Sequence, residues 1–241
     1  MASEETSYRI LIVGVGGLGV PAAWALARDG AGRISLVDPE AVELSNLARQ
    51  VIFRDADIGA PKVEAAARRL VERFSRVRID THEIALDESN AARLVAAHDF
   101  VIDATDSPVA KFTINDACVA ARKPFAYGGV IGMTGQVMTV IPHVSACLRC
   151  VFEGPPDEDE IQSCREAGIV GAVAGAIGTM QAAEAMRASR AQTLLLSGKI
   201  LTYDAASPAR VRITEVNPRP GCRCGASKSQ RVPATGANET S

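Results

Sequence analysis

The sequence has few aromatic residues, no excess of either charge and no long apolar run. Aromatic residues make up 4% of the 241 residues, which disfavours a β-sandwich with an aromatic-filled core. The formal net charge is -2, with both signs interspersed, which is not typical of proteins that bind nucleic acid or anionic membranes. The stretch Ala167 to Ala183, which has no charged residue, is shorter than the ~20 residues of a transmembrane helix. We therefore expect neither nucleic acid nor a membrane as a partner.

The N-terminus and the cysteines narrow the protein class further. The first residues, MASEETSYR, hold two glutamates and no apolar segment, so we expect no secretory signal and a cytoplasmic protein. Six cysteines in that compartment are expected to be thiols. Four of them form two close pairs, Cys147-x-x-Cys150 and Cys222-x-Cys224, which favours metal binding or catalysis over disulfides. The three histidines have no spacing typical of a metal site or a catalytic triad.

The alternation of apolar runs and turn residues predicts an α/β protein. Strands are predicted at Arg9–Val13, Ile34–Val37, Val77–Ile84, Phe100–Ala104, Phe125–Ile131, Gln136–Ile141, Ile200–Tyr203 and Val211–Val216. Helices are predicted at Ala22–Arg28, Val42–Gln50, Pro61–Phe74, Ser89–Ala97, Val109–Ala121 and Gly171–Ala188. The first half alternates strand and helix, which is typical of a parallel sheet, whereas the close succession of strands after Phe125 indicates antiparallel additions in the C-terminal half. We expect a short N-terminal segment (1–8), one domain (9–225) and a disordered tail (226–241).

A glycine-rich loop, Gly14-Val-Gly-Gly-Leu-Gly19, stands between the first strand and the first helix. Such a loop lets the backbone approach a phosphate and directs free N–H groups at it. Asp38 closes the second strand, about 20 residues further on, where an acidic side chain can bind a ribose hydroxyl. The pattern indicates a bound nucleotide but does not say which one, because hydride-transferring enzymes share it.

Three charged residues favour ATP over a dinucleotide. Arg49 and Lys62 follow the glycine loop along the chain, and Asp106 follows the predicted strand Phe100–Ala104. A triphosphate carries more negative charge than the pyrophosphate of a dinucleotide, so it needs cations and a carboxylate that holds a metal ion. The set therefore favours Mg-ATP, and an NAD-binding oxidoreductase is the alternative enzyme class.

Eight short segments form a more specific pattern. They are Val13–Gly19, Leu36–Asp38, Ser45–Gln50, Gly59–Glu64, Asp103–Asp106, Cys147–Cys150, Cys164–Gly168 and Gly221–Gly225. In composition and order this pattern resembles the ThiF/MoeB/HesA-type family of ubiquitin-activating-enzyme-like adenylyltransferases. The resemblance implies a Rossmann-like, mostly parallel sheet flanked by helices, usually dimeric. It also implies adenylation, with Mg-ATP, of the C-terminal carboxylate of a small ubiquitin-like sulfur-carrier protein ending in Gly-Gly, with subsequent sulfur transfer in some relatives.

The resemblance implies a role for each candidate residue. Asp38 would bind the ribose, and Asp106 would hold Mg²⁺. Arg49 and Lys62 would neutralise the triphosphate and the departing pyrophosphate. The remaining expected nucleotide-binding residues are Gly14, Gly16, Gly17, Gly19, Ser45, Asn46, Gln50 and Ser107. A non-catalytic relative that only binds the carrier is a further alternative.

The cysteines have two implied roles. Cys147, Cys150, Cys222 and Cys224 would form a structural four-thiolate zinc site, although the family usually has Cys-x-x-Cys where this chain has Cys-x-Cys. A reduced cluster without metal is the alternative. Cys164 matches a position that in some relatives links covalently to the carrier or passes sulfur, and the alternative is a thiol without a catalytic part.

The beginning of the sequence departs from the family's usual pattern. Relatives usually begin with a helical arm that reaches the ATP site of the neighbouring subunit, and here eight residues precede Arg9. We therefore expect that this arm is missing. A C-terminal rhodanese domain is not expected either, so the sulfur donor would be a separate protein.

Overall fold

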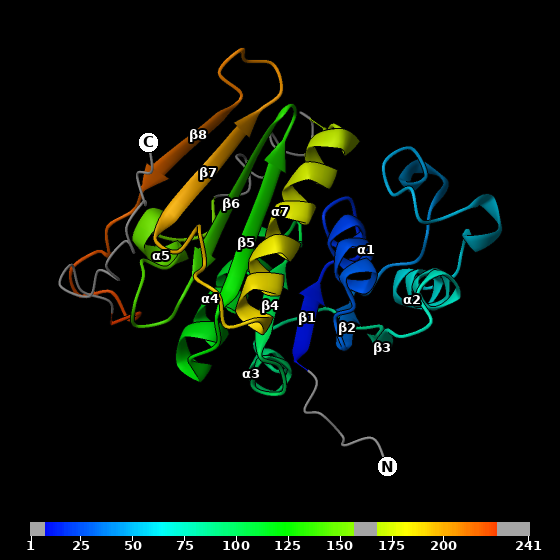
Figure 1. Ribbon diagram of the computed structural model, residues 1–241, viewed down its shortest axis with the longest axis horizontal. Coiled ribbons are helices and arrows are strands. Elements are labelled where there is room, and N and C mark those ends of the chain that lie inside the picture. The colour runs from blue at the N-terminus through cyan, green and yellow to red at the C-terminus, as the bar shows by residue number, and fades with distance from the viewer. Residues whose placement is uncertain (1–7, 157–167, 226–241) are drawn as a thin grey trace, which may run out of the picture.

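The structure, a computed structural model, describes residues 8–156 and 168–225, and these ranges contain an eight-stranded sheet in the order β3-β2-β1-β4-β5-β6-β7-β8 (Figure 1). The strands are β1 (Arg9–Val13), β2 (Arg33–Val37), β3 (Arg78–His82), β4 (Phe100–Asp103), β5 (Phe125–Ile131), β6 (Thr134–Val140), β7 (Lys199–Asp204) and β8 (Val211–Glu215). Neighbours from β3 to β5 are parallel, and neighbours from β5 to β8 are antiparallel. The predicted α/β class, a mostly parallel sheet with antiparallel strands added in the C-terminal half, is confirmed.

Helices cover both faces of the sheet. They are α1 (Gly19–Asp29), α2 (Lys62–Arg73), α3 (Ala91–Ala96), α4 (Pro108–Ala121), α5 (Leu148–Val151) and α7 (Gly171–Ser189). α1, α2 and α7 pack on the face that buries Ile12 and Leu36, and α3, α4 and α5 pack on the face that buries Leu11 and Val13 (Figure 1). Successive side chains of a strand point to opposite faces, so each central strand contributes to two hydrophobic cores.

α7 packs very closely against the beginning of α1. A Cβ atom at Gly178 would lie 2.1 Å from the backbone oxygen of Leu18, so only glycine fits there. Nearer its N-terminus, Ala174 approaches the glycine-rich loop, since a Cβ atom at Gly17 would lie 3.3 Å from the Cβ of Ala174. The small residues of α7 therefore allow this helix to lie against the loop that follows β1.

The segment between β2 and α2 differs from the prediction. The sequence pattern predicts a helix at Val42–Gln50, and this prediction is wrong, because the segment forms the short 3-10 helix η1 (Leu44–Asn46) instead. Asn46 Oδ1 accepts a hydrogen bond from Glu43 N at 3.1 Å. Such local bonds from an asparagine side chain compete with an α-helix and favour turns.

A buried aspartate ties the same segment to α2. Asp57 ends the second 3-10 helix, η2 (Asp55–Asp57), and is 1% exposed. Its carboxylate lies 2.6 Å from Arg68 Nη2 and 3.1 Å from Arg69 Nη2. These ion pairs hold the segment against the helix that begins with Lys62.

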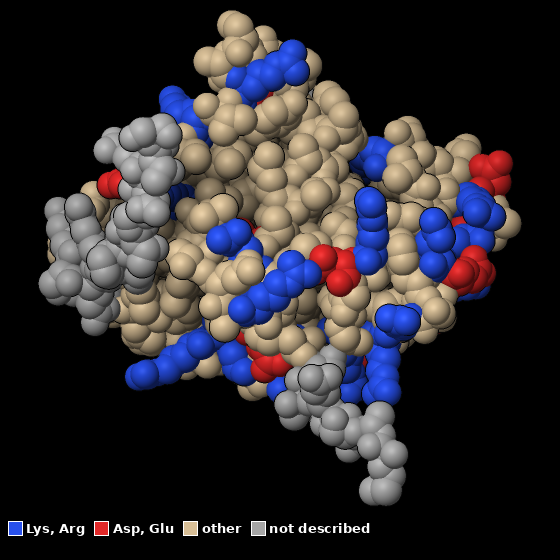
Figure 2. All heavy atoms as spheres, viewed as in Figure 1, with Lys and Arg blue, Asp and Glu red and all other residues tan. Residues whose placement is uncertain are grey.

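The other predicted strands and helices are present, with ends shifted by a few residues. Cys118, a residue of α4, is fully buried in the hydrophobic core. Within the described ranges, no helix is both long and apolar enough to span a bilayer. Lys and Arg side chains are spread over the face in Figure 2, and several lie beside Asp or Glu. The predicted tail at 226–241 lies outside the described residues.

Candidate active site and metal centre

The glycine-rich loop lies at the carboxyl ends of β1, β2 and β4. Gly14 has a φ of +93° and donates its N–H to Val37 O at 2.8 Å. A Cβ atom at Gly14 would lie 2.6 Å from Ala104 O, and one at Gly19 would lie 1.8 Å from Gly14 O. Both glycines are therefore required by close backbone packing. Ligands of open α/β sheets bind at this edge, where the direction of the crossovers reverses.

The N-terminus of α1 is suited to an anion. No acidic residue stands in its first turn, and Leu18 at the N-cap makes no side-chain hydrogen bond to it. In this first turn Val20 donates its N–H to Gly16 O at 3.1 Å and Pro21 has no N–H, so a phosphate would accept from N–H groups that precede Val20. The residues present at the end of the loop therefore fit a phosphate group.

Asp38 lies directly after β2 and holds the loop in place. It is 7% exposed, and its Oδ2 accepts the N–H of Val15 at 2.7 Å while Oδ1 accepts that of Glu40 at 2.9 Å. Burial raises the pKa of this carboxyl above its ordinary value, although both N–H groups lower it. Each carboxylate oxygen has a further lone pair, so these bonds are compatible with the predicted contact to a ribose.

Gln50 is a buried side chain beside the loop. It is 3% exposed, and its Oε1 has no hydrogen-bond partner among the described residues. A Cβ atom at Gly16 would lie 3.6 Å from Gln50 Nε2, so the amide faces the loop. A buried polar atom without a partner is costly. The amino or hydroxyl groups of a nucleotide are donors that could satisfy it.

The predicted cations occupy different surroundings. Lys62, the first residue of α2, is buried, and its Nζ forms an ion pair with the exposed carboxylate of Glu40. Arg49 donates to Ser45 O at 3.1 Å, and a Cβ atom at Gly171 would lie 3.1 Å from Arg49 Cβ. Arg49 is thus placed at the beginning of α7, the helix that also approaches the glycine loop.

The turn between β4 and α4 carries the predicted metal ligand. Asp106 is exposed, and Ser107 caps α4 through its Oγ, which accepts the N–H of Ala110 at 3.3 Å. The turn contacts the glycine loop, because Gly14 packs on Ala104. The contacts of this edge therefore bring the loop, Asp38, Gln50 and the Asp106 turn together. Cys164 lies outside the described residues.

Two buried residues and one partly buried lysine near this edge were not predicted as parts of the site. Asp103, Lys111 and Gln181 form a hydrogen-bonded group at the end of β4. A charged residue at the end of an otherwise apolar strand, as in Phe-Val-Ile-Asp, is the local signal that points to Asp103. Its partners come from α4 and α7, and no spacing in the sequence indicates them.

The two cysteine pairs meet to form a candidate metal centre. All four Sγ atoms of Cys147, Cys150, Cys222 and Cys224 lie within 4.8 Å of one another. Cys147 Sγ lies 3.6 Å from that of Cys222, and Cys150 Sγ lies 3.6 Å from that of Cys224. Sulfur atoms around a tetrahedral zinc ion, with bonds of about 2.3 Å, are about 3.8 Å apart. The sulfur–sulfur distances are therefore close to those around a tetrahedral zinc ion, even though the second pair is Cys-x-Cys.

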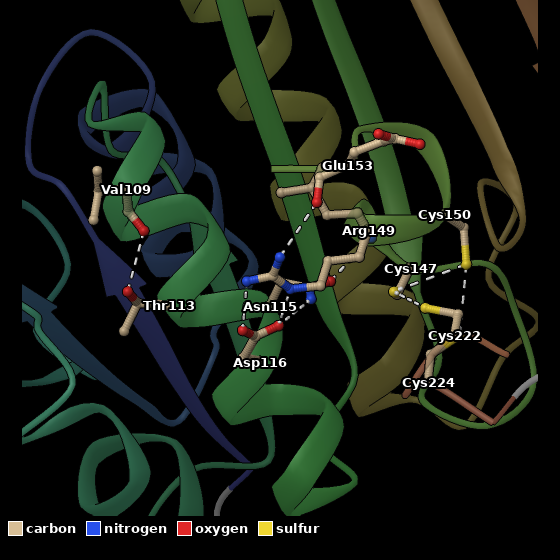
Figure 3. A network of polar contacts seen from close by, with 11 residues as sticks. Val109, Thr113, Asn115, Asp116, Cys147, Arg149, Cys150, Glu153, Cys222 and Cys224 are labelled. Carbon is tan, nitrogen blue, oxygen red and sulfur yellow. Dashed lines mark hydrogen bonds and ion pairs between the residues drawn. The ribbon is translucent and has the colours of Figure 1, made fainter. Parts of the chain in front are cut away.

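Side chains of α4 support the loop that carries the first cysteine pair (Figure 3). The buried Asn115 accepts the N–H of Leu148 through its Oδ1 at 2.9 Å. Asp116 accepts two hydrogen bonds from Arg149, each 2.8 Å long. Burial and the neighbouring thiols raise the pKa of the Cys147 thiol above its ordinary value. A bound cation would favour the thiolate form and oppose this shift.

The comparison with known families agrees with this geometry. The pattern of the ThiF family matches residues 4–224. The chain belongs to the ThiF family. The predicted resemblance is thereby confirmed.

Curated relatives of this ThiF-family chain are named as adenylyltransferases. The "Adenylyltransferase and sulfurtransferase MOCS3" of Arabidopsis thaliana is 38% identical over 210 residues, which cover 87% of this chain and 45% of that protein. The "Sulfur carrier protein adenylyltransferase" of Thermus thermophilus is 35% identical over 228 residues, which cover 92% of this chain and 84% of that protein. The chain thus spans less than half the length of the MOCS3 relatives.

A solved structure shares the fold. The E. coli MccB structure with ATP superposes with a TM-score of 0.78 at 22% sequence identity, covering 89% of this chain and 65% of that one. At this identity the likeness concerns the fold alone.

Proposed function

We propose that this ThiF-family chain is an ATP-dependent adenylyltransferase that activates the C-terminal carboxylate of a small ubiquitin-like sulfur-carrier protein ending in Gly-Gly. The observation that carries the proposal is the convergence of the glycine loop, Asp38 and the Asp106 turn at one edge of the sheet. The names of the Arabidopsis and Thermus relatives support the same class of reaction. Residues 9–225 would then form one adenylation domain.

In this proposal ATP lies across the carboxyl ends of β1, β2 and β4. N–H groups between Gly16 and Gly19, at the end of the loop, bind phosphate oxygens. The oxygens of Asp38 accept from the ribose, and Gln50 Oε1 gains the donor that it lacks. Asn46, Ser45 and Ser107 complete the surroundings of the nucleotide.

In the proposal, two cations and a Mg²⁺ ion held by a carboxylate neutralise the phosphate charge. Lys62 would exchange the Glu40 carboxylate for a phosphate, which costs little, because the Glu40 side chain is 66% exposed and returns to water. Arg49 would approach from the beginning of α7. Asp106, being exposed at the end of β4, would hold Mg²⁺, which neutralises phosphate charge when bound.

The reaction needs positioning more than proton transfer. A C-terminal carboxylate has a pKa of about 3.5 and is ionised at neutral pH. One of its oxygens attacks the α-phosphorus of ATP, the bond from that phosphorus to the bridging oxygen breaks, and pyrophosphate leaves with the oxygen. No general base is required, so the residues of the chain align the two reactants and stabilise the developing charge.

Exchange of labelled pyrophosphate into ATP in the presence of a Gly-Gly carrier tests the proposal. We expect exchange that depends on Mg²⁺ and on the carrier, and a loss of at least about 100-fold in Asp106→Ala. Asp29→Ala is the control, because Asp29 ends α1 at the far edge of the sheet in an exposed ion pair with Arg190. Equal activity of the two variants would contradict the assignment of Asp106.

Two other results would favour the alternatives. Thermal stabilisation by NAD and not by Mg-ATP would favour an oxidoreductase, since a ligand stabilises the native state that binds it. Stabilisation by Mg-ATP and by the carrier without any exchange would indicate a non-catalytic relative that only binds the carrier.

We further propose that the four cysteines hold a structural zinc ion, that Cys164 serves sulfur transfer from a separate donor protein, and that the chain forms a homodimer in the cytoplasm. The sulfur distances support the zinc. Three exposed apolar side chains in the segment between β2 and α2, Leu44, Val51 and Ile58, support an interface with a second copy, because exposed apolar side chains gathered in one segment are typical of protein contacts.

A further inference from the structure

A buried ion pair lies at the base of the turn that carries Asp106. Asp103 is the last residue of β4 and is 0% exposed, and the side chain of Lys111 on α4 is 13% exposed. Lys111 Nζ lies 3.1 Å and 3.3 Å from the two carboxylate oxygens of Asp103. In sequence the pair stands on either side of Asp106, so the ion pair closes the loop formed by the turn.

Short hydrogen-bonded links continue from this pair into the turn. Asp103 Oδ1 also accepts the N–H of Thr105 at 3.3 Å, and Thr105 Oγ1 accepts the N–H of Ser107 at 3.1 Å. Ser107 in turn caps α4. Asp106 is exposed between these links, so its backbone is held on both sides while its carboxylate is left accessible.

The end of β4 is held from both faces of the sheet. On the α4 face, Lys111 Nζ donates to Gly128 O of β5 at 2.6 Å. On the α7 face, the fully buried Gln181 donates its Nε2 to Asp103 O at 2.6 Å and to Ala126 O at 2.9 Å. The pairing of β4 with β5 ends at Asp103, after which Ala104 N bonds to Val13 O of β1. Lys111 and Gln181 thus bridge the point where β4 leaves β5.

Burying the Asp103–Lys111 ion pair costs free energy. Two charges lose much of their hydration on burial, and apolar residues of similar volume are often as stable or more stable. Gly128 must also lack a side chain, because a Cβ atom there would lie 2.6 Å from the Gln181 amide. Stability alone therefore does not account for the arrangement, whereas a fixed position of the Asp106 turn does.

We propose that Lys111 is a positioning residue for adenylation. It holds Asp103, and through Asp103 the turn 104–107, in the arrangement that presents the Asp106 carboxylate to the nucleotide. The inference rests on the proposed function and gives Lys111 no contact with ATP or the carrier. Because the loop after β1 and Asp38 after β2 bind the nucleotide without Lys111, loss of Lys111 should lower kcat and weaken Mg²⁺ activation far more than it weakens ATP binding.

Three variants test the proposal. Lys111→Met keeps the length of the side chain without its charge, and Lys111→Arg restores a cation. Lys123→Met is the control, because Lys123 follows the same helix and pairs with Asp99 at the surface, at 3.8 Å. We expect kcat for pyrophosphate exchange to fall at least about tenfold in Lys111→Met, with Kd for ATP within about threefold of wild type, and Lys111→Arg to regain most of kcat. Lys123→Met should match wild type.

Amide hydrogen exchange of the turn provides a readout without catalysis. In the absence of nucleotide, the amides of Thr105 and Ser107 should exchange faster in Lys111→Met than in Lys123→Met. Unchanged protection together with unchanged kcat would overturn the proposal, and so would an equal loss of ATP affinity and kcat. If wild type shows no carrier-dependent exchange, the proposed function fails, while the protection of the turn still decides whether Lys111 positions it.

A double variant covers the case in which Lys111→Met does not fold. Asp103→Asn/Lys111→Met leaves no lone buried charge, so its native state avoids the main penalty of the single variant. The double variant also removes the Lys111 ammonium group, which contacts both Asp103 of β4 and Gly128 of β5. We expect the same loss of kcat and the same faster exchange of the turn, and a folded double variant with wild-type kcat would refute the role of the pair.

Discussion

The hydrogen bond from Leu148 N to Asn115 Oδ1 is expected to be worth more than the two bonds of the neighbouring Arg149–Asp116 pair. Asn115 and Leu148 are each 1% exposed, and the bond length is 2.9 Å. Asn115→Ala removes the acceptor and leaves the Leu148 N–H buried without a partner. In the Arg149–Asp116 pair, the side chains are 31% and 45% exposed, so water can replace either partner.

The expected magnitudes differ accordingly. A buried N–H left without an acceptor costs about 1–3 kcal/mol, whereas an exposed ion pair contributes about 0–1 kcal/mol. For a chain of this size, 1 kcal/mol corresponds to roughly 2–4 °C in Tm. Asn115→Ala should therefore lower Tm by about 2–12 °C and Asp116→Asn by about 0–4 °C.

Urea unfolding with zinc in excess measures both variants. We expect a lower free energy of unfolding for Asn115→Ala with an unchanged denaturant slope. Because Leu148, the first residue of α5, lies between Cys147 and Cys150 in the chain, Asn115→Ala should also lose metal to a chelator faster than Asp116→Asn. Equal stabilities and equal rates of metal loss in the two variants would show that the buried bond does not support the metal loop.

Three further predictions concern the metal, acid stability and sulfur chemistry. Protein purified without chelator should hold about one zinc ion per chain. Cys222→Ser should lose this ion, whereas the control Cys118→Ser, which changes a cysteine in the hydrophobic core, should retain it. Wild-type protein without zinc would contradict the assignment. Burial would raise the pKa of Asp57, but the amide and guanidinium groups around it outweigh burial and lower that pKa. Its stabilising effect is then complete above its unfolded pKa near 4 and is lost as pH falls through the lower folded pKa. Asp57→Asn should therefore be less stable than wild type at pH 7 by about 1–2 kcal/mol, and the difference should shrink as the pH is lowered through the folded pKa. A difference independent of pH would be the contrary result. Cys164→Ala should leave pyrophosphate exchange unchanged and abolish thiocarboxylate formation on the carrier, because sulfur transfer needs a nucleophile and adenylation does not. A Cys164→Ala variant that still forms the thiocarboxylate would show that Cys164 takes no part in the chemistry.

Local chemistry by itself determined most of the strands, most of the helices and the loop that follows β1. Gly14 and Gly19 predicted a tight loop between a strand and a helix, because a loop that approaches a phosphate leaves no room for a side chain at such positions. Proline at 61 correctly indicated the beginning of α2, since its missing N–H costs nothing there. The same kind of local reasoning was wrong at Val42–Gln50, where the Asn46 side chain bonds back to Glu43 and a turn replaces the helix.

Tertiary structure decided which of these pieces meet. Cys147 and Cys222 are far apart in the chain, yet their sulfur atoms lie 3.6 Å apart, because β7 pairs with β6 and β8 pairs with β7 before the chain reaches Cys222. The positions of Lys111, Gln181 and Gln50 also depend on packing between segments that are far apart in the chain. Periodicity and turn residues report the conformation of a few neighbouring residues, whereas strand order and helix packing depend on the burial of the whole core. A contact between distant segments therefore has no local signature in the sequence.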